Sequence, residues 1–170
     1  MPGDAVRLYR ELLELEPDHV EGRLQFARLL DRLEEAADAV EVLSDGLRRA
    51  PDQTEFLVLR GSILGRLQRY REAEADLRRV LRLHPSHAPG QFELGLLLWR
   101  RGLVQEAAAS FHRALEFQPD NAKTYYYLGD ALNQVGDPKA CHLMGRVLDR
   151  LKLPEQAQEM YRRCRDLTGL

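Results

Sequence analysis

The sequence predicts an all-α fold in which antiparallel helix pairs stack into a solenoid, with about ten helices and no strands. The main observation is a repeat, because Pro17, Pro51, Pro85 and Pro119 follow one another at intervals of 34 residues. The second observation is that apolar residues recur at helical spacing between these prolines. A fixed period of this length is typical of arrays whose units bury their apolar faces only against their neighbours.

Each proline is followed by a residue that can cap a helix: Asp18, Asp52, Ser86 and Asp120. Proline cannot continue the helix before it, because it lacks an N–H donor and its ring clashes with the preceding turn. Asp and Ser side chains accept hydrogen bonds from the free N–H groups at the start of a helix. The sequence therefore predicts that one helix ends at each proline and that the next begins directly after it, with Asp or Ser as the N-cap.

The chain then divides into three full repeats of equal length: 20–53, 54–87 and 88–121. The third repeat shows the pattern best, through Gln91, Leu94, Gly95, Leu98, Ala107 and Phe111. Equivalent positions hold Gly61, Ala73 and Leu77 in the second repeat, and Ala27, Ala39 and Leu43 in the first. Small residues at these positions let two helices approach, and large residues fill the seam between them.

This pattern closely resembles the tetratricopeptide repeat. The resemblance implies a right-handed superhelical solenoid. It also implies a non-catalytic scaffold or adaptor that binds a peptide or protein partner in a concave groove, lined by the first helix of each repeat. The whole chain, 1–170, is expected to form a single domain of this kind, although both of its ends depart from the pattern.

The first 19 residues match only the second helix of a repeat, so we expect a half repeat at 1–19. The expected core residues are Ala5, Tyr9 and Leu12, and further residues make the helix apolar nearly all round: Val6, Leu8, Leu13 and Leu15. A helix with this pattern needs cover on more than one side. Three explanations stay open: upstream repeats in a longer parent chain, a self-association face, or a partner subunit.

Near the other end, Tyr125, Leu128 and Gly129 indicate a first helix, but Cys141 and Gly145 indicate a first helix again. We therefore expect that a second helix is absent between them. This gives an irregular repeat at 122–153, followed by a polar-backed capping helix at 154–170. The helix at 139–151 should pack against the helix at 122–135, because its apolar face has no other cover.

Cys141 and Cys164 are expected at the same height on facing helices. Two buried thiols are favoured there over a disulfide.

One stripe of the first helices is expected to flank the packed seam and to line the groove. In the last two units it holds Phe92, Leu96, Trp99, Tyr126, Asp130 and Asn133. Aromatic residues dominate binding hot spots, so this stripe is a candidate partner site with Trp99 as its best single residue. In the alternative interpretation, Phe92, Leu96 and Tyr126 bury against neighbouring helices and Trp99 covers the joint.

Arginines add a second candidate feature to the same helices. Arg32, Arg66 and Arg100 recur at one repeat period, and Arg28 lies on the expected groove stripe. A row of guanidinium groups would suit an acidic peptide or a terminal carboxylate. The alternative is local, because each of the three periodic arginines lies in the last turn of its helix, where the helix dipole favours a cation.

Arg23 and Arg60 stand in columns that the repeat usually makes apolar. We expect their stems to pack and their charged heads to reach water or an acid.

Composition restricts the remaining functions. A formal net charge of −2 argues against a general nucleic-acid partner. No stretch approaches the roughly 18 apolar residues of a membrane span, so no membrane insertion is expected and a cytoplasmic location is the default. His84 and His87 are too few for a metal site, and no cofactor motif, nucleophile–base pair or phosphate loop stands out, so we expect no enzyme.

Two function hypotheses follow. The first is the groove-binding scaffold. The second is a structural subunit or self-associating module of a larger assembly, held through its ends. A third possibility, the repeat domain of an enzyme whose catalytic part lies elsewhere, stays open.

Overall fold

The computed structural model describes residues 2–134, 139–150, 152 and 154–168. Within these ranges the chain forms ten helices and no strand, as the sequence predicts. They are α1 (Pro2–Leu15), α2 (Val20–Arg32), α3 (Ala36–Arg49), α4 (Thr54–Arg66), α5 (Tyr70–Leu83), α6 (Ala88–Arg100), α7 (Val104–Phe117), α8 (Ala122–Gln134), α9 (Lys139–Arg150) and α10 (Pro154–Thr168).

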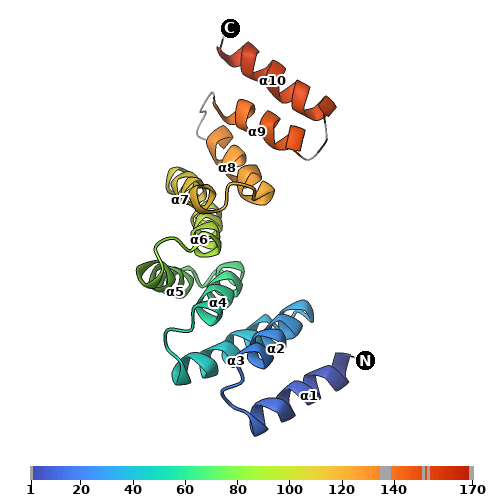
Figure 1. The fold of residues 1–170 in the computed structure, drawn as a ribbon, viewed down its shortest axis with the longest axis vertical. Coiled ribbons are helices and arrows are strands. Elements are labelled where there is room, and N and C mark those ends of the chain that lie inside the picture. The colour runs from blue at the N-terminus through green and yellow to red at the C-terminus, as the bar shows by residue number, and fades with distance from the viewer. Residues whose placement is uncertain (1, 135–138, 151, 153, 169–170) are drawn as a thin grey trace. The chain divides into compact units, whose positions relative to one another are not determined.

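The chain comprises two compact units, Met1–Pro85 with α1 to α5 and Ser86–Leu170 with α6 to α10. Inside each unit, successive helices pack side by side as antiparallel pairs, α2 with α3 and α4 with α5 in the first, α6 with α7 in the second (Figure 1). The all-helical array of pairs is therefore confirmed. The expectation that both units belong to one solenoid domain stays a prediction.

Each regular pair is closed by a small residue on the first helix and a large residue 16 positions later on the second. Ala27 and Leu43 are both fully buried in the first pair. A Cβ placed on Gly61 would lie 2.9 Å from Cγ of Leu77, and one on Gly95 would lie 2.6 Å from two carbons of the Phe111 ring. The helices approach so closely because glycine has no side chain at these points.

The N-caps lie one residue later than the sequence analysis placed them. The first helices are preceded at one-repeat intervals by His19, Gln53, His87 and Asn121. Nδ1 of His19 accepts the N–H of Gly22 at 2.9 Å, and Nδ1 of His87 accepts the N–H of Gly90 at 2.9 Å. The expected caps fail because proline and its successor both lie in the turn, so the helix begins one residue further on.

The turn inside each full repeat uses one residue in the left-handed conformation. These residues are Glu34 (φ 65°), Gln68 (φ 61°) and Gly102 (φ 75°). At the last of them, the N–H of Leu103 donates to the carbonyl of Leu98 at 2.9 Å and the N–H of Gly102 to that of Trp99 at 3.0 Å. This is the Schellman arrangement, which satisfies carbonyls at the helix end.

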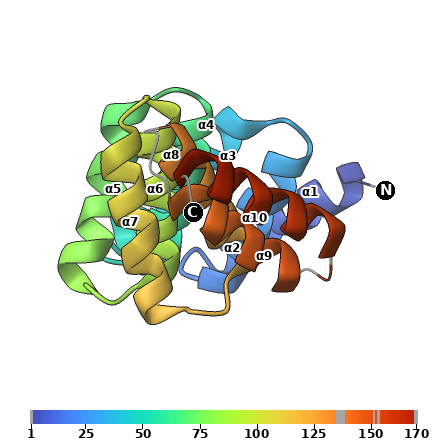
Figure 2. The same cartoon turned by 90° about the horizontal axis from the view of Figure 1, so that it is seen from above.

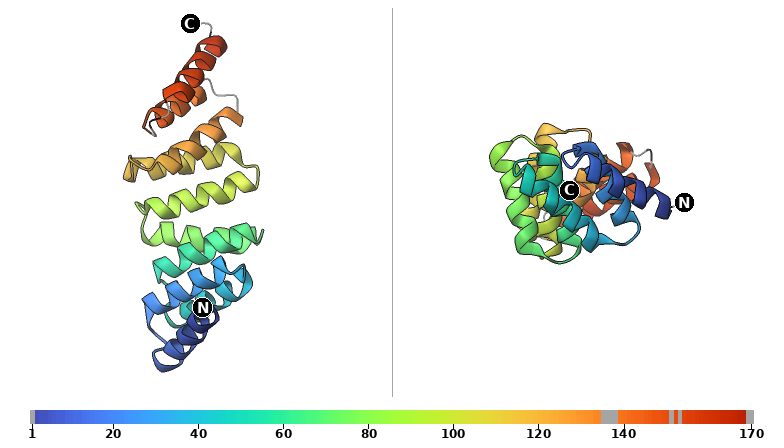
Figure 3. Two further views of the ribbon diagram at one scale, coloured as in Figure 1. Left: turned by 90° about the vertical axis from the view of Figure 1, so that its right-hand side faces the viewer. Right: turned by 90° about the horizontal axis from the view of Figure 1, so that it is seen from below.

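The second unit contains the irregular part of the array. Here α8 packs against both α7 and α9, so the expected packing of α9 on α8 is confirmed (Figure 3). Helices α9 and α10 lie side by side (Figure 2). A Cβ on Gly145 of α9 would lie 2.5 Å from the ring of Tyr161 on α10. That is the 16-residue relation of a regular pair, so α8 is a first helix followed directly by another first helix.

Cys141 on α9 is buried. The side chain of Cys164 is outside the described residues, and so is the expected pairing of these two cysteines.

Helix α1 packs on α2 on one side only. The ring of Tyr9 stacks on that of Phe26 at 5.7 Å, and a Cβ on Gly22 would lie 2.6 Å from a methyl carbon of Leu12. The opposite side keeps apolar side chains in solvent, since Leu8 is 58% exposed and Leu15 is 83% exposed.

Candidate partner-binding surface

An aromatic cluster joins α6, α7 and α8 in the second unit. The ring of Tyr127 on α8 is its centre, with its centroid 5.8 Å from those of Phe92 and Trp99 on α6 and 5.8 Å from that of Phe111 on α7. Edge-to-face and offset contacts at this separation add stability beyond area burial. The cluster therefore fixes where α8 lies against α6.

At the edge of this cluster, Trp99 is held by a polar contact. Its indole Nε1 donates to Oδ2 of Asp130 at 2.8 Å, and Nε2 of Gln134 donates to the same oxygen at 2.7 Å. Trp99 is only partly buried, so one region of its ring remains accessible. A tryptophan whose rotamer is fixed in advance loses little conformational entropy when a partner covers it.

The structure separates the predicted stripe into a buried part and an accessible part. Phe92 and Leu96 are 8% and 5% exposed, so they pack in the core of the unit as the alternative interpretation expects. Tyr126 is 53% exposed, which differs from the burial that the same interpretation gave it. Asn133 is exposed as well. The accessible part of the surface is thus formed by Trp99 on α6 with Tyr126, Asp130 and Asn133 on α8.

Sequence analysis overlooked two members of this surface. Tyr127 is partly buried and contacts four other rings, including that of Tyr126 at 5.4 Å. Nζ of Lys123 lies 5.2 Å from the ring centroid of Phe92, a cation–π contact. The run of three tyrosines beginning at Tyr125 was the available signal, because consecutive helical positions cannot all lie on one face.

The predicted arginines lie where their sequence positions place them. Arg32, Arg66 and Arg100 each occupy the last turn of a first helix, which agrees with the helix-dipole interpretation. Arg66 pairs with Asp31 inside the first unit. Arg28 is exposed on α2.

The two unusual core arginines behave differently from each other. Arg60 reaches an acid as expected, because its Nε and one terminal nitrogen donate to the two carboxylate oxygens of Asp76, both at 2.8 Å. The head of Arg23 forms no ion pair with an acid in the described part of the chain. It donates to the backbone carbonyl oxygens of Val42 at 2.9 Å and Pro17 at 2.6 Å, which corrects the expectation for this residue.

The described part of the chain was also searched for metal sites and for membrane-spanning helices. No group of three His, Cys, Asp or Glu side chains there could hold a metal ion, and His87 serves as a helix cap. Of the helices described, none has the length and apolar character needed to cross a membrane.

Comparison with protein families gives three matches, all to models described as tetratricopeptide repeats. They cover residues 1–63, 58–122 and 138–167. The last match spans α9 and α10, in agreement with the contact between Gly145 and Tyr161. Comparison with curated protein sequences found no match.

Solved structures share the fold. MamA (residues 41 to the end) from Desulfovibrio magneticus RS-1 is 22% identical with a TM-score of 0.77, over 92% of this chain and 87% of that one. A tetratricopeptide repeat protein from Parabacteroides merdae is 18% identical with a TM-score of 0.71, over 98% and 72%. An O-GlcNAc transferase mutant from Thermobaculum terrenum is 29% identical with a TM-score of 0.72, over 76% of this chain and 26% of that one.

The repeat period, the helix pairs closed by small and large residues 16 positions apart, and these matches agree along the array. Proteins built from this repeat are generally non-catalytic scaffolds for protein interaction. The chain belongs to the tetratricopeptide repeat family.

Proposed function

We propose that this protein is a non-catalytic adaptor that binds a peptide or protein partner in a concave groove lined by its first helices, with the surface around Trp99 as the main contact. The observation that carries the proposal is the partly buried Trp99, whose indole donates to Asp130 of α8 at 2.8 Å, together with the exposed Tyr126 on the same helix α8. An apolar side chain of the partner would cover both rings. A cytoplasmic location and the absence of nucleic-acid binding, suggested by the balanced charge, are part of the same proposal.

Two core aromatics have a supporting role in this proposal. Phe92 and Leu96 position α8 and do not touch the partner directly unless the helices shift. Arginines of the first helices would contribute where the partner is acidic: the exposed Arg28, Arg32 and Arg66, and the partly buried Arg100.

The test is affinity capture from the source organism with quantitative mass spectrometry. Tyr126→Ala removes an exposed ring at little structural cost, and Trp99→Ala removes the fixed indole. Phe117→Ala is the matched control, because Phe117 is 46% exposed in the same unit but lies on α7, a second helix. We expect the partner to be depleted with both surface variants and retained with the control. Full retention by Tyr126→Ala and Trp99→Ala would refute this surface as the site.

A second candidate function is self-association or assembly through α1. The exposed Leu8 and Leu15 on its uncovered side favour it. Light scattering over a range of concentrations should show a larger species that Leu8→Glu with Leu15→Glu abolishes. A monomer at every concentration would eliminate self-association.

A further inference from the structure

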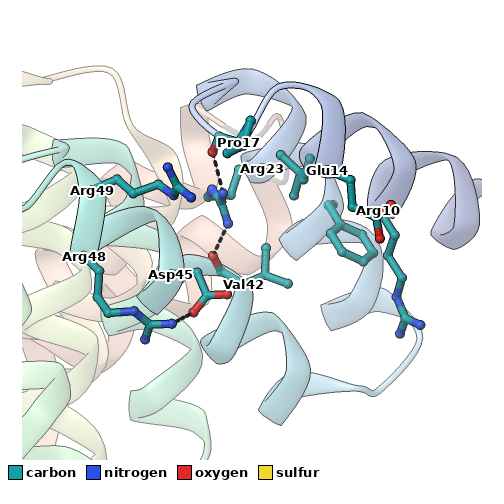
Figure 4. Close-up of a pocket in the computed structure, with 10 residues that line it drawn as sticks. Arg10, Glu14, Pro17, Arg23, Val42, Asp45, Arg48 and Arg49 are labelled. Carbon is teal, nitrogen blue, oxygen red and sulfur yellow. Dashed lines mark hydrogen bonds and ion pairs between the residues drawn. The ribbon is translucent and has the colours of Figure 1, made fainter.

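An arginine-lined cleft lies in the first unit. It has a volume of about 640 Å³ and lies between α1, α2 and α3 (Figure 4). We call it the Arg23 cleft and define it by Arg23, Phe26, Val42, Asp45, Arg48 and Arg49. Arg10 and Glu14 of α1 line its opposite side. Four cations thus face two carboxylates around a partly apolar floor, and the volume is in the range of ligand sites.

Arg23 is the unusual member, because its charge is buried and forms no ion pair with a described acid, although Asp45 and Asp18 lie near enough to act on it. The residue is 6% exposed, and its stem passes over Gly46 of α3, where a Cβ would collide with it. Its guanidinium donates two hydrogen bonds, one to the carbonyl of Val42 and one to that of Pro17. In the described part of the chain, no carboxylate lies within ion-pair distance of it. A guanidinium has five N–H donors, so some remain for a ligand.

The electrostatic surroundings of Arg23 favour an added anion. Burial lowers its pKa, and the charges of Arg49 and Arg48 lower it further, although Asp45 and Asp18 act in the opposite direction. A buried charge without a paired counterion is costly, and an anion in the cleft would offset that cost.

Arg48 and Arg49 can exchange their present carboxylate partners for a carboxylate of a ligand. Arg48 pairs with Asp45, and Arg49 lies 3.3 Å from Asp18, with the side chains in both pairs more than half exposed. Exposed ion pairs of this kind contribute about 0–1 kcal/mol, so a ligand carboxylate can replace the internal one at small cost.

The next repeat provides an internal comparison. A smaller cavity of about 300 Å³ is lined there by residues one period later, among them Arg48, Pro51, Leu57, Arg60 and Arg79. Its half-buried arginine, Arg60, has a bidentate carboxylate partner in Asp76. The position equivalent to Asp76 in the Arg23 cleft is Val42, which offers only its carbonyl oxygen. The two cavities hold their arginines at different repeat positions, because Leu57 corresponds to Arg23 and Phe26 corresponds to Arg60. They also differ in the partners of those arginines: Arg60 binds a carboxylate, whereas Arg23 binds backbone carbonyls.

We propose that the Arg23 cleft binds an acidic segment of a protein partner, with a carboxylate against Arg23, Arg48 and Arg49 and an apolar side chain over Phe26. Bidentate arginine–carboxylate bonds give such a site geometric specificity. The apolar floor and the two carboxylates in the wall favour a peptide over a nucleic acid, whose sites need an extended basic surface. This site is formed by residues of α1, α2 and α3, and it shares no residue with the Trp99 surface.

Fluorescence anisotropy with the full chain tests the proposal. The probe is a fluorescein-labelled, C-amidated peptide, Glu-Glu-Leu-Glu-Glu, with Gln-Gln-Leu-Gln-Gln as the uncharged control. We expect the acidic peptide to bind and the double variant Arg48→Gln with Arg49→Gln to weaken it at least about tenfold. The matched control, Arg71→Gln with Arg78→Gln, removes the same charge from exposed positions of α5 that line neither cavity, and Arg79→Gln tests the second cavity. Both should change the affinity less than about threefold.

A further variant tests the missing counterion directly. Val42→Asp places an acid in the Arg23 cleft at the position of Asp76, and we expect it to abolish peptide binding while circular dichroism shows an intact fold. Equal affinity in the arginine double variant or in Val42→Asp, or equal binding of the glutamine peptide, would overturn the proposal. Inorganic phosphate that displaces the peptide as effectively as free acidic peptide does would overturn the assignment to a carboxylate. Loss of binding in Tyr126→Ala would place the peptide on the other surface.

Discussion

Replacing Gly95 by alanine tests the close approach of α6 and α7. The new Cβ would lie 2.6 Å from two carbons of the Phe111 ring and 3.0 Å from a third. Phe111 is fully buried between Phe92 and Tyr127, with ring centroids 5.8 Å away on both sides, so it cannot move aside. Overpacking of this kind costs about 1–3 kcal/mol. The better helix propensity of alanine returns about 1 kcal/mol, so we expect a net loss of up to about 2 kcal/mol.

Gly129→Ala is the matched control, since it makes the same change in the same column of the repeat. Its Cβ would meet the sulfur and Cγ of Met144, a flexible side chain that can turn away. We expect this variant to be neutral or slightly more stable. Thermal unfolding followed by circular dichroism and by Trp99 fluorescence should show a lower midpoint, by up to about 8 °C, for Gly95→Ala alone. If Gly95→Ala raises the midpoint as Gly129→Ala does, the close packing argued from Phe111 is wrong.

Three further predictions concern single contacts. Asp76→Ala leaves the guanidinium of Arg60 without its carboxylate partner and should lower the free energy of unfolding in urea by about 3 kcal/mol. Asp52→Ala is the control, because it removes the exposed partner of Arg79 and should cost less than about 0.5 kcal/mol. Gln68→Gly removes the strain of a side chain in the left-handed conformation and should stabilise the protein by about 0.5–1 kcal/mol. Gly102→Ala introduces that strain and should destabilise the protein by a similar amount. Effects of the same sign in the two variants would contradict the turn geometry. The pKa of Tyr161 is raised above its ordinary value of 10.0, first by burial and then by its hydrogen bond to Asp149. The folded state is therefore stabilised fully below pH 10, and this stabilisation is lost as the pH rises from 10 toward the raised pKa. Tyr161→Phe should remove that part of the alkaline pH dependence of the unfolding midpoint, and an unchanged profile would refute it.

The sequence was sufficient for the array because its signals are local. A proline cannot continue the helix that precedes it, and a glycine 16 residues before Phe111 defines a helix pair without knowledge of the rest of the chain. The same locality explains the misplaced N-caps. Asp and Ser are strong capping residues, so they were preferred to His19 and His87, which stand one position later and make the observed bonds.

The candidate site was less predictable because a stacked helix is buried on several sides. Phe92 and Leu96 lie off the seam with α7 in a helical projection, yet both are buried in the core of the unit, where Tyr127 of the neighbouring first helix α8 contacts Phe92. A single-helix pattern contains no information about that neighbour. Arg23 shows the same limit, because its partners are backbone carbonyls, which any residue provides.

The residue types at the turns do not predict which residues adopt the left-handed conformation. Gly102 could be expected at such a position, but Glu34 and Gln68 adopt the same conformation without any compositional signal. Their conformation follows from the Schellman hydrogen bonds that close the turn, for example from the N–H of Glu35 to the carbonyl of Leu30 at 2.9 Å.

The 16-residue relation inside each pair also bears on how the chain folds. The contacts of Gly61 with Leu77 and of Gly95 with Phe111 each close a short loop, so the entropy lost before they form is small. Proteins dominated by such local contacts fold in microseconds to milliseconds, and repeat arrays can nucleate in any unit and propagate to the next. The chain can therefore begin to fold during synthesis, one repeat at a time, before its C-terminal helices have left the ribosome.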